Sequence, residues 1–265
     1  MPSPVDNAIE GKLALVTGAS GGIGAACAKA LWRQGVNLAL TYSSSLDKIL
    51  ALEEELWKLR PKQGPDGDIG PVISTHKVDV GSVKDIERLF DSIRILHGRD
   101  GPDILVSNAG HGKRIPDIAD ISIDEFDYTL NINLRASFIL SKFSIPHMTA
   151  QKWGRIIYVS SLAAGGGGIN GCHYAASKAG LHGLMKSLAN KHAKDGITVN
   201  DVAPAMIKET GMIPDEKFLE GTPGDVRNIP VGRLGTPQEV ANVVLMFCQT
   251  GYLTGQSVLL SGGLK

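Results

Sequence analysis

Tyr174 and Lys178 stand four residues apart in the segment HYAASKAG, residues 173–180. If this segment is helical, four residues make about one turn and the two side chains project from the same face. Small residues surround them and leave that face open to a large ligand. A cation beside a phenol favours the phenolate, so we expect Lys178 to lower the pKa of Tyr174 and prepare it for acid–base chemistry. The alternative is an exposed tyrosine beside a solvated lysine.

A glycine-rich turn, TGASGGIG, occupies residues 17–24 between the first expected strand and the first expected helix. Its glycines at 18, 22 and 24 allow a tight turn, a close approach of a phosphate, and close packing of helix on strand. The helix N-terminus adds unpaired N–H groups and the positive end of a dipole. This placement favours a nucleotide site over a purely structural turn.

The segment TYSSS, residues 41–45, follows the second expected strand. A fold specific for NAD(H) usually carries an acid about twenty residues beyond the glycines, where it binds the ribose 2′-hydroxyl. Ser43 and Ser44 instead offer hydroxyl groups that can donate to a 2′-phosphate, which predicts NADP(H). Methyltransferases that use S-adenosylmethionine also place a glycine-rich turn here, but they have no use for Tyr174 and Lys178 together.

Short apolar runs alternate with helix-like segments along the chain. The expected strands are residues 12–17, 36–42, 72–80, 103–110, 155–161, 197–204 and 256–263. The expected helices cover residues 22–34, 46–60, 83–96, 122–143 and 172–194, and one more begins at Pro237. This order predicts an α/β fold: one dinucleotide-binding domain over residues 1–265, with a doubly wound Rossmann-type parallel sheet of about seven strands and helices on both faces. Ligands in such sheets bind beyond the carboxyl ends of the strands.

Local signals refine this outline. Ser122 with Glu125, and Thr236 with Glu239, have the spacing of capping boxes. The glycines at 165–168 predict a loop too flexible to join any element, and residues 61–71 predict a surface loop.

Five motifs occur in a fixed order: the glycine-rich turn, NAG at Asn108, Asn133 within NINLRASF, Ser161 thirteen residues before Tyr174, and Tyr174 four residues before Lys178. Together they resemble the short-chain dehydrogenase/reductase family, in particular its 3-oxoacyl-(acyl carrier protein) reductase-like and polyhydroxynaphthalene reductase-like members. The resemblance extends from about Gly11 to Gly263. The one departure is Pro204-Ala205, where the family usually has Pro-Gly; alanine adopts a positive φ less readily, so we expect a differently shaped turn.

The resemblance implies roles for four catalytic residues. Tyr174 would be the general acid, and Lys178 would both tune it and bind the nicotinamide ribose. Ser161 would polarise the substrate carbonyl, whereas Ser160 would be structural. Asn133 would hold a water that leads protons to the lysine, or else be a buried asparagine tied to the backbone.

The resemblance also implies the cofactor contacts. Asp79 would bind the adenine, Asn108 to Gly110 would flank the adenosine ribose or stabilise the central strand, and Ile207 would contact the carboxamide. The full predicted set is Gly18, Ser20, Gly21, Gly22, Ile23, Tyr42, Ser43, Ser44, Asp79, Val80, Asn108, Ala109, Gly110, Tyr174, Lys178, Pro204 and Ile207.

Substrate contacts should come from the loops after the fourth to sixth strands. The candidates are His111, Lys113, Arg114, Asn170 and His173, each with a solvated loop residue as the alternative. Residues 207–225 are expected to form a lid. The family also implies a homo-oligomer, a tetramer or a dimer.

Composition limits the other classes of function. Twenty-seven basic residues balance 27 acidic ones in the 265-residue chain, and the basic residues are scattered, so neither nucleic acid nor a membrane surface is an expected partner. The three cysteines lack metal-type spacing and are expected to be small core residues, with no metal bound. The polar N-terminus predicts a cytoplasmic protein. The sequence thus predicts an NADP(H)-dependent ketoreductase acting on a 3-oxoacyl or cyclic, polyketide-type carbonyl. The alternatives are an NAD-dependent secondary-alcohol dehydrogenase and a non-catalytic dinucleotide-sensing protein.

Overall fold

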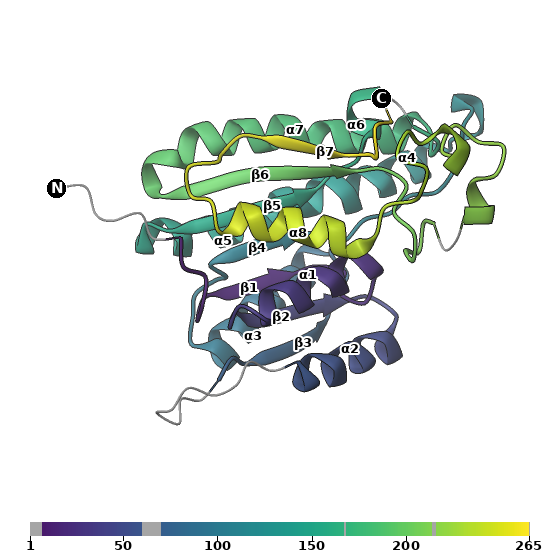
Figure 1. The fold of residues 1–265 in the computed structure, drawn as a ribbon. Helices are drawn as coiled ribbons and strands as arrows, with labels where there is room; N and C mark the ends of the chain where they lie inside the picture. Colours follow the sequence, from purple (N-terminus) through teal and green to yellow (C-terminus); the bar gives the residue numbers. More distant parts are fainter. Residues whose placement is uncertain (1–6, 60–69, 167, 214–215, 265) are drawn as a thin grey trace.

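Seven parallel strands form one sheet at the centre of the molecule (Figure 1). The computed structural model describes residues 7–59, 70–166, 168–213 and 216–264. The strands are β1 (Leu13–Val16), β2 (Asn37–Tyr42), β3 (Ile73–Lys77), β4 (Ile104–Ser107), β5 (Gly154–Val159), β6 (Ile197–Pro204) and β7 (Ser257–Leu260). Their order in the sheet is β3-β2-β1-β4-β5-β6-β7. β2 and β3 therefore lie on one side of β1, and β4 to β7 lie on the other. Ligands in such folds bind at the point, here between β1 and β4, where the strand order reverses.

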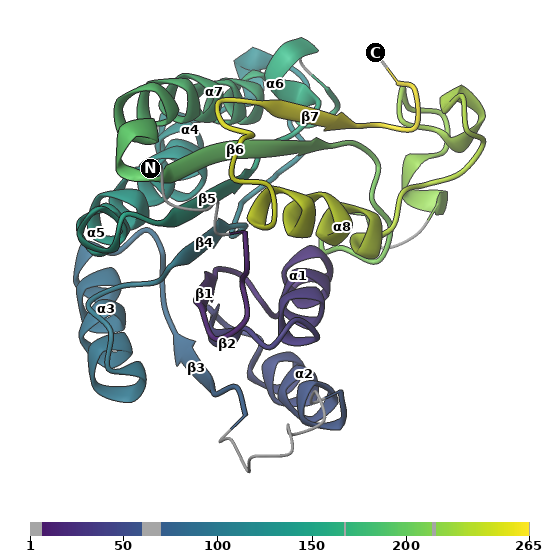
Figure 2. The ribbon, with the colours of Figure 1, turned by 60° about the vertical axis from the view of Figure 1, so that its left-hand side comes forward.

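Helices cover both faces of the sheet (Figure 2). On one face lie α1 (Gly22–Trp32), α2 (Leu46–Lys58) and α8 (Pro237–Cys248). On the other lie α3 (Val83–His97), α5 (Ala136–Gln151) and α7 (Cys172–His192), with α4 (Ile123–Leu130) leading into α5. The predicted doubly wound Rossmann-type fold is thereby confirmed.

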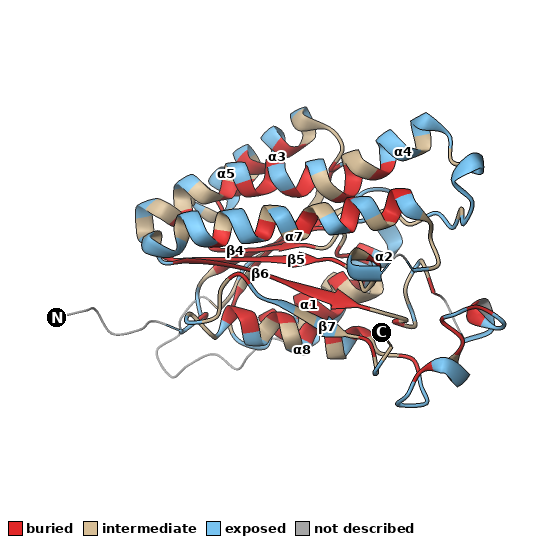
Figure 3. Ribbon diagram, turned by 90° about the horizontal axis from the view of Figure 1, so that it is seen from above, coloured by how far each residue is buried: buried red, intermediate tan, exposed pale blue. Residues whose placement is uncertain are grey.

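Side-chain alternation along the strands divides the core into two layers. Ala14 and Val16 of β1 pack with α1 and α8, whereas Leu13 and Leu15 pack with α3 and α5. Buried residues accordingly line the sheet-facing sides of the helices, and exposed ones line their outer sides (Figure 3). Since both faces of a parallel sheet are covered, its central strands read as continuous apolar runs.

The two expected capping boxes differ in the structure. At α8 the box is complete, because Thr236 accepts from the N–H of Glu239 and the Glu239 carboxylate accepts from the N–H of Thr236. At α4 only half forms: Ser122 accepts from the N–H of Glu125, but the Glu125 carboxylate binds His111 instead. The capping-box prediction at Ser122 was therefore wrong in its reciprocal half, because a partner from a distant loop competes for the glutamate.

The expected helix over residues 122–143 is interrupted and longer than predicted. A π-helical segment, Asn131–Arg135, separates α4 from α5, and α5 continues through Pro146 to Gln151. Asn133 lies inside this π segment. Such segments are frequent at functional sites because they disturb the regular ladder of hydrogen bonds.

Two further predictions needed correction. Gly165 and Gly166 were wrongly predicted to belong to no element, since Ala163–Gly166 forms a short helix, α6, closed by a hydrogen bond from the N–H of Gly165 to the carbonyl of Leu162. Cys27 and Cys248 are buried as expected, but Cys172 is exposed at the start of α7. Most of the predicted surface loop at 61–71 lies outside the described residues. Among the described helices, none is long and apolar enough to cross a membrane.

Candidate active site

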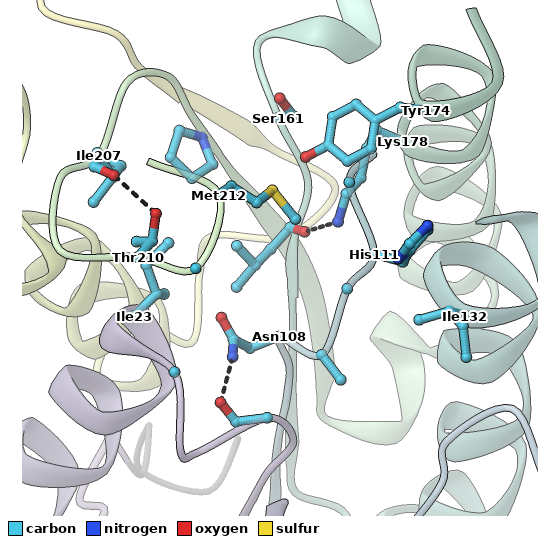
Figure 4. Close-up of a pocket in the computed structure, with 18 of the residues that line it drawn as sticks. Ile23, Asn108, His111, Ile132, Ser161, Tyr174, Lys178, Ile207, Thr210 and Met212 are labelled. Carbon is cyan, nitrogen blue, oxygen red and sulfur yellow. Dashed lines mark hydrogen bonds between the residues drawn. The ribbon is translucent and has the colours of Figure 1, made fainter. Parts of the chain in front are cut away.

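A cavity of about 630 Å³ opens at the carboxyl ends of the strands (Figure 4). This volume lies within the usual range for small-molecule and cofactor sites. The structure brings most of the predicted residues to its wall. They are Gly18, Ser20, Gly21, Gly22, Ile23, Tyr42, Ser43, Asp79, Val80, Asn108, Ala109, Gly110, Ser161, Tyr174, Lys178, Pro204 and Ile207.

The glycine-rich turn is held tightly against the end of β4. Gly18 has φ +64°, and a Cβ there would lie 3.0 Å from the Cα of Ala109. The side-chain amide of Asn108 donates to the carbonyls of Thr17 and Gly18 at 2.9 and 3.2 Å, while the Thr17 hydroxyl accepts from the N–H of Asn108 at 3.0 Å. Asn108 therefore stabilises the turn directly, and the turn presents the N-terminus of α1 to the cavity.

Hydroxyl groups line the cavity at the end of β2. The buried Thr41 accepts from the N–H of Gly18 at 3.3 Å, and Tyr42 and Ser43 face the cavity. Ser44 is exposed and outside the described cavity wall. Its predicted contact is therefore not supported, since the chain turns into α2 at this point and carries Ser44 outward.

Asp79 and Val80 follow β3 and close the same end of the cavity. One carboxylate oxygen of Asp79 accepts from the N–H of Gly81 at 2.9 Å. That bond fixes the side chain at the edge of the cavity.

Tyr174, Ser161 and Lys178 meet on the wall formed by β5 and α7 (Figure 4). The Ser161 hydroxyl lies close enough to the Tyr174 phenol to lower its pKa. The Lys178 ammonium donates to the carbonyl of Val159 at 2.9 Å and lies 5.7 Å from the centre of the Tyr174 ring. The spacing of one helical turn thus places both side chains on one face, as predicted.

The electrostatics of this pair differ from the prediction. Burial raises the pKa of Tyr174 above its ordinary value, and the Ser161 hydroxyl offsets only part of that effect. Burial also lowers the pKa of Lys178 to about 8, against an opposing contribution from the Asp201 carboxylate. The expected lowering of the tyrosine pKa by Lys178 was therefore wrong for this structure, because the ammonium is directed at a strand carbonyl and desolvation dominates at the phenol.

Asn133 is buried behind the cavity rather than in its described wall. Its Oδ1 accepts from the N–H of His111 at 2.7 Å, and its Nδ2 donates to the carbonyl of His111 and to Ser177 Oγ, both at 2.9 Å. Its backbone carbonyl accepts from Ser137 at 3.1 Å. These bonds favour the alternative of an asparagine tied to the backbone, and its role in proton transfer stays a prediction.

The turn after β6 accommodates Ala205 in a way that the sequence did not indicate. The left-handed conformation falls on Met206, with φ +52°, and a second one on Glu209, with φ +59°. Ala205 itself donates its N–H to the carbonyl of Leu260 at 2.9 Å. The changed turn shape is therefore located one residue later than expected.

The substrate-side candidates separate into three groups. His111 and Asn170 line the cavity, and the His111 ring packs edge-on against Tyr128 with 4.9 Å between ring centres. Lys113 is exposed and pairs with Glu125 at 3.4 Å, and Arg114 is also exposed. The prediction for His173 was wrong, because its side chain points into the protein and is fully buried outside the described wall.

Several cavity residues had no signal in the sequence. Among them are Tyr128, Ile132, Val159 and Met206. Met212 belongs to the predicted lid, but its neighbours there could not be predicted. Met212 lies against Gly112 and Asn170, where a Cβ on Gly112 would come within 2.7 Å of its sulfur. These contacts join segments about 40 to 100 residues apart, so local spacing could not reveal them.

Known proteins resemble this chain in sequence and in fold. A family model described as Enoyl-(Acyl carrier protein) reductase matches residues 18–265. The 3-oxoacyl-(acyl-carrier-protein) reductase FabG of Aquifex aeolicus is 35% identical over 97% of this chain and 98% of its own length. The protein of the same name from Escherichia coli (strain K12) is 36% identical over 96% of this chain and 98% of its own length. A short-chain dehydrogenase/reductase from Serratia marcescens, solved as a double mutant, superimposes with a TM-score of 0.83 at 30% identity, covering 97% of this chain and 99% of that one.

The chain belongs to the short-chain dehydrogenase/reductase family and is an oxidoreductase. A nicotinamide dinucleotide is the cofactor that membership implies, and the glycine-rich turn at the N-terminus of α1 fits its pyrophosphate.

Proposed function

We propose that the protein reduces the ketone of a 3-oxoacyl thioester or a cyclic, polyketide-type substrate to a secondary alcohol, with NADPH as the reductant. The observation that carries this proposal is the meeting of Tyr174, Ser161 and Lys178 on the wall of a cavity that continues to the glycine-rich turn. The names of the two 3-oxoacyl reductases support the 3-oxoacyl class.

NADPH, when bound, supplies the hydride that reaches the carbonyl carbon. Ser161 hydrogen-bonds the substrate oxygen and stabilises the charge that develops on it. Tyr174 donates a proton to that oxygen, which becomes the alcohol. The raised pKa of Tyr174 keeps its proton in place at neutral pH, as a general acid requires. Lys178 lies beside the phenol and would bind the nicotinamide ribose.

Reduction needs Tyr174 as the neutral phenol, which burial favours. Because the same residue would act as the base in the reverse reaction, the choice of the ketoreductase over an NAD-dependent secondary-alcohol dehydrogenase is supported by other observations. These are the serine that lines the cavity at the end of β2 and the names of the two 3-oxoacyl reductases.

The test is the loss of NADPH or NADH absorbance with a β-ketoacyl thioester, a cyclic diketone and an aromatic polyketide-like ketone. We expect oxidation of NADPH with at least one of them, and Tyr174→Phe to lower kcat by about 10²- to 10⁴-fold while NADPH still binds. Tyr158→Phe is the matched control, since it removes another buried phenol that bonds Ser141 outside the cavity wall. Tight NADPH binding without turnover in the wild type would favour the sensing protein, and equal activity of Tyr174→Phe would remove the proposed acid.

Cofactor preference has its own matched pair of variants. Ser43 lines the cavity at the end of β2, whereas Ser44 does not. A carboxylate at position 43 would repel a 2′-phosphate, so we expect Ser43→Asp to weaken NADPH binding about tenfold relative to NADH. Ser44→Asp, with the same charge one residue further on, should change the ratio of the two affinities much less. Equal effects of the two variants would contradict the proposed phosphate contact.

We also propose that residues 207–225 act as a lid, within a single domain that carries both cofactor and substrate sites. Ile213 and Leu219 pack with Ile229 and Leu234 in a small core separate from the two layers on the sheet. Ile213 and Leu219 of the segment therefore pack with residues 229–234 rather than with the layers on the sheet, which supports movement relative to the sheet. We expect NADPH to slow proteolysis within it.

Association between copies is proposed on the outer face of α5 and α7. Phe138 is 51% exposed there, beside an apolar hollow lined by Leu130, Leu134 and Leu184. β7 is the edge of the sheet and offers unpaired backbone groups as well. Light scattering should show a dimer or tetramer, and Phe138→Glu should shift it toward smaller species.

A further inference from the structure

A buried carboxylate lies behind the catalytic wall. Asp201 is on β6, and its side chain is 0% exposed. Its register partner on β5 is Tyr158, the residue before Val159, whose carbonyl holds the Lys178 ammonium. Adjacent strands are about 4.8 Å apart. The carboxylate and the anchor of the lysine therefore occupy neighbouring positions in the sheet.

The partners of Asp201 come from every element that packs around it. Ser160, the residue after β5, donates to its Oδ1 at 3.0 Å. From β7, Ser257 donates to the same oxygen at 2.5 Å. From α7, His182 Nε2 lies 3.0 Å from Oδ2.

Position on α7 links this carboxylate to the active site. Lys178 and His182 are one helical turn apart on the same face, as Tyr174 and Lys178 are. His182, 34% exposed, lies beside the Asp201 carboxylate, and the buried Lys178 stands one turn earlier on the same helix face. Burial raises the pKa of Asp201, whereas the hydrogen bond from Ser257 and the electrostatic interactions with His182 and Lys178 act in the opposite direction. The Asp201 carboxylate in turn favours the charged form of Lys178.

We propose that Asp201 is the counter-charge that keeps Lys178 protonated, and that His182 and the two serines stabilise this carboxylate, which makes Asp201 a positioning residue for the catalytic lysine. A buried ammonium without a counter-charge gives up its proton at lower pH. Ser160 has a defined part in this network, since its hydroxyl is bound to Asp201 behind the wall. The consequence for the reaction rests on the proposed function, but the protonation of Lys178 does not.

The experiment follows Lys178 directly. The NMR signals of ¹³Cε-labelled lysine are titrated between pH 5 and 10, conditions chosen to bracket the Lys178 pKa of about 8, and the Lys178 signal is assigned by its absence in Lys178→Met. In Asp201→Asn, which keeps the shape of the side chain, we expect the midpoint to fall by about one pH unit or more. In His182→Gln we expect a smaller fall in the same direction.

Asp103→Asn is the matched control, because it neutralises another fully buried aspartate far from Lys178, before β4. It should leave the midpoint of Lys178 unchanged. An unchanged midpoint in both Asp201→Asn and His182→Gln would overturn the proposal, and so would an equal fall in Asp103→Asn. Should Asp201→Asn fail to fold, an unchanged midpoint in the surface variant His182→Gln alone would overturn it.

A kinetic readout separates this proposal from the proposed function. If the protein reduces a ketone with NADPH, Asp201→Asn should lose activity at pH 8 and regain it near pH 6, where Lys178 is charged again. A structural role alone would lower activity equally at both pH values. If the wild type shows no turnover at all, the NMR titration still decides the role of Asp201.

Discussion

The polar groups at the two ends of the sheet differ in their bonding partners. At the amino end, the Asp103 carboxylate accepts from the N–H of Leu13 and from Arg99, both at 2.7 Å, and pairs with His147 at 3.0 Å. Arg155 is similarly held there, by the carbonyl of Cys248 and the ring of Trp153. These groups tie β1, β4 and β5 to the surrounding helices.

At the carboxyl end, several polar groups face a cavity and can form hydrogen bonds with a ligand. The hydroxyls of Ser161 and Tyr174 face it, and the glycine-rich turn exposes the N-terminus of α1. A group whose bonds are all made inside the protein stabilises the fold, whereas a group that faces a cavity is available to a ligand. Substitutions at the two ends should therefore separate activity from stability.

The largest effect is expected for Lys178→Met at the carboxyl end. We expect kcat to fall at least about 100-fold, with little loss of thermal stability, because the buried Asp201 carboxylate keeps its contacts with Ser160, Ser257 and His182. Lys186→Met is the matched control, since Lys186 lies two turns further along α7 and also donates to a carbonyl, that of Gly255. Turnover at several pH values and thermal denaturation would measure both quantities. A loss of stability without a loss of turnover would contradict the proposed difference between the two ends of the sheet.

Next in size is Asp103→Ala at the amino end. It leaves Leu13, Arg99 and His147 without their acceptor, and we expect a loss of about 3 kcal/mol in the free energy of unfolding. Thermal denaturation should show a clear fall in Tm, while kcat per folded molecule stays unchanged. Asp100→Ala, which removes an exposed partner of Arg94, should cost well under 1 kcal/mol. A drop in kcat for Asp103→Ala would show that the two ends are coupled.

Gly24→Ala should affect both stability and cofactor binding, because the glycine-rich turn is part of the fold and of the site. A Cβ on Gly24 would lie 2.4 Å from the carbonyl oxygen of Gly18 and 2.8 Å from the amide nitrogen of Asn108. We expect a cost of about 1–3 kcal/mol and weaker NADPH binding as the turn shifts. Gly183→Ala in α7 is the control, since its Cβ would meet nothing within 4 Å. Normal NADPH affinity in Gly24→Ala would place the cofactor elsewhere.

The smallest effect is expected for Thr236→Ala, which removes the cap of α8. This residue lies at the carboxyl end but is bonded within its own capping box, so only stability should change, by about 1 kcal/mol. That corresponds to a fall in Tm of about 2–4 °C. Thr236→Ser keeps the hydroxyl and should behave like the wild type. A large loss of activity in Thr236→Ala would contradict the comparison. It would mean that a residue at the carboxyl end can be functional even when its polar groups are already bonded within the protein.

Regular elements followed from local patterns more closely than the details of the site did. The apolar runs and the glycines marked all seven strands and the long helices, because their signals lie within a few residues of one another. Gly165 and Gly166 were misjudged because a local hydrogen bond, from the N–H of Gly165 to the carbonyl of Leu162, closes a short helix despite the low helix propensity of glycine. Glu125 was misjudged because its competing partner, His111, comes from another loop.

The sequence by itself determined the order of the elements, the turn that faces a dinucleotide, and the placement of Tyr174 and Lys178 on one face of one helix. Each depends on spacing along the chain, which helix and strand geometry convert into position. Tertiary structure alone decided that Asn133 is tied to the backbone of His111, that Ser44 turns away from the cavity, and that Asp201 lies beneath α7. These outcomes depend on burial and on contacts between distant segments, and the same burial reversed the expected shift in the pKa of Tyr174.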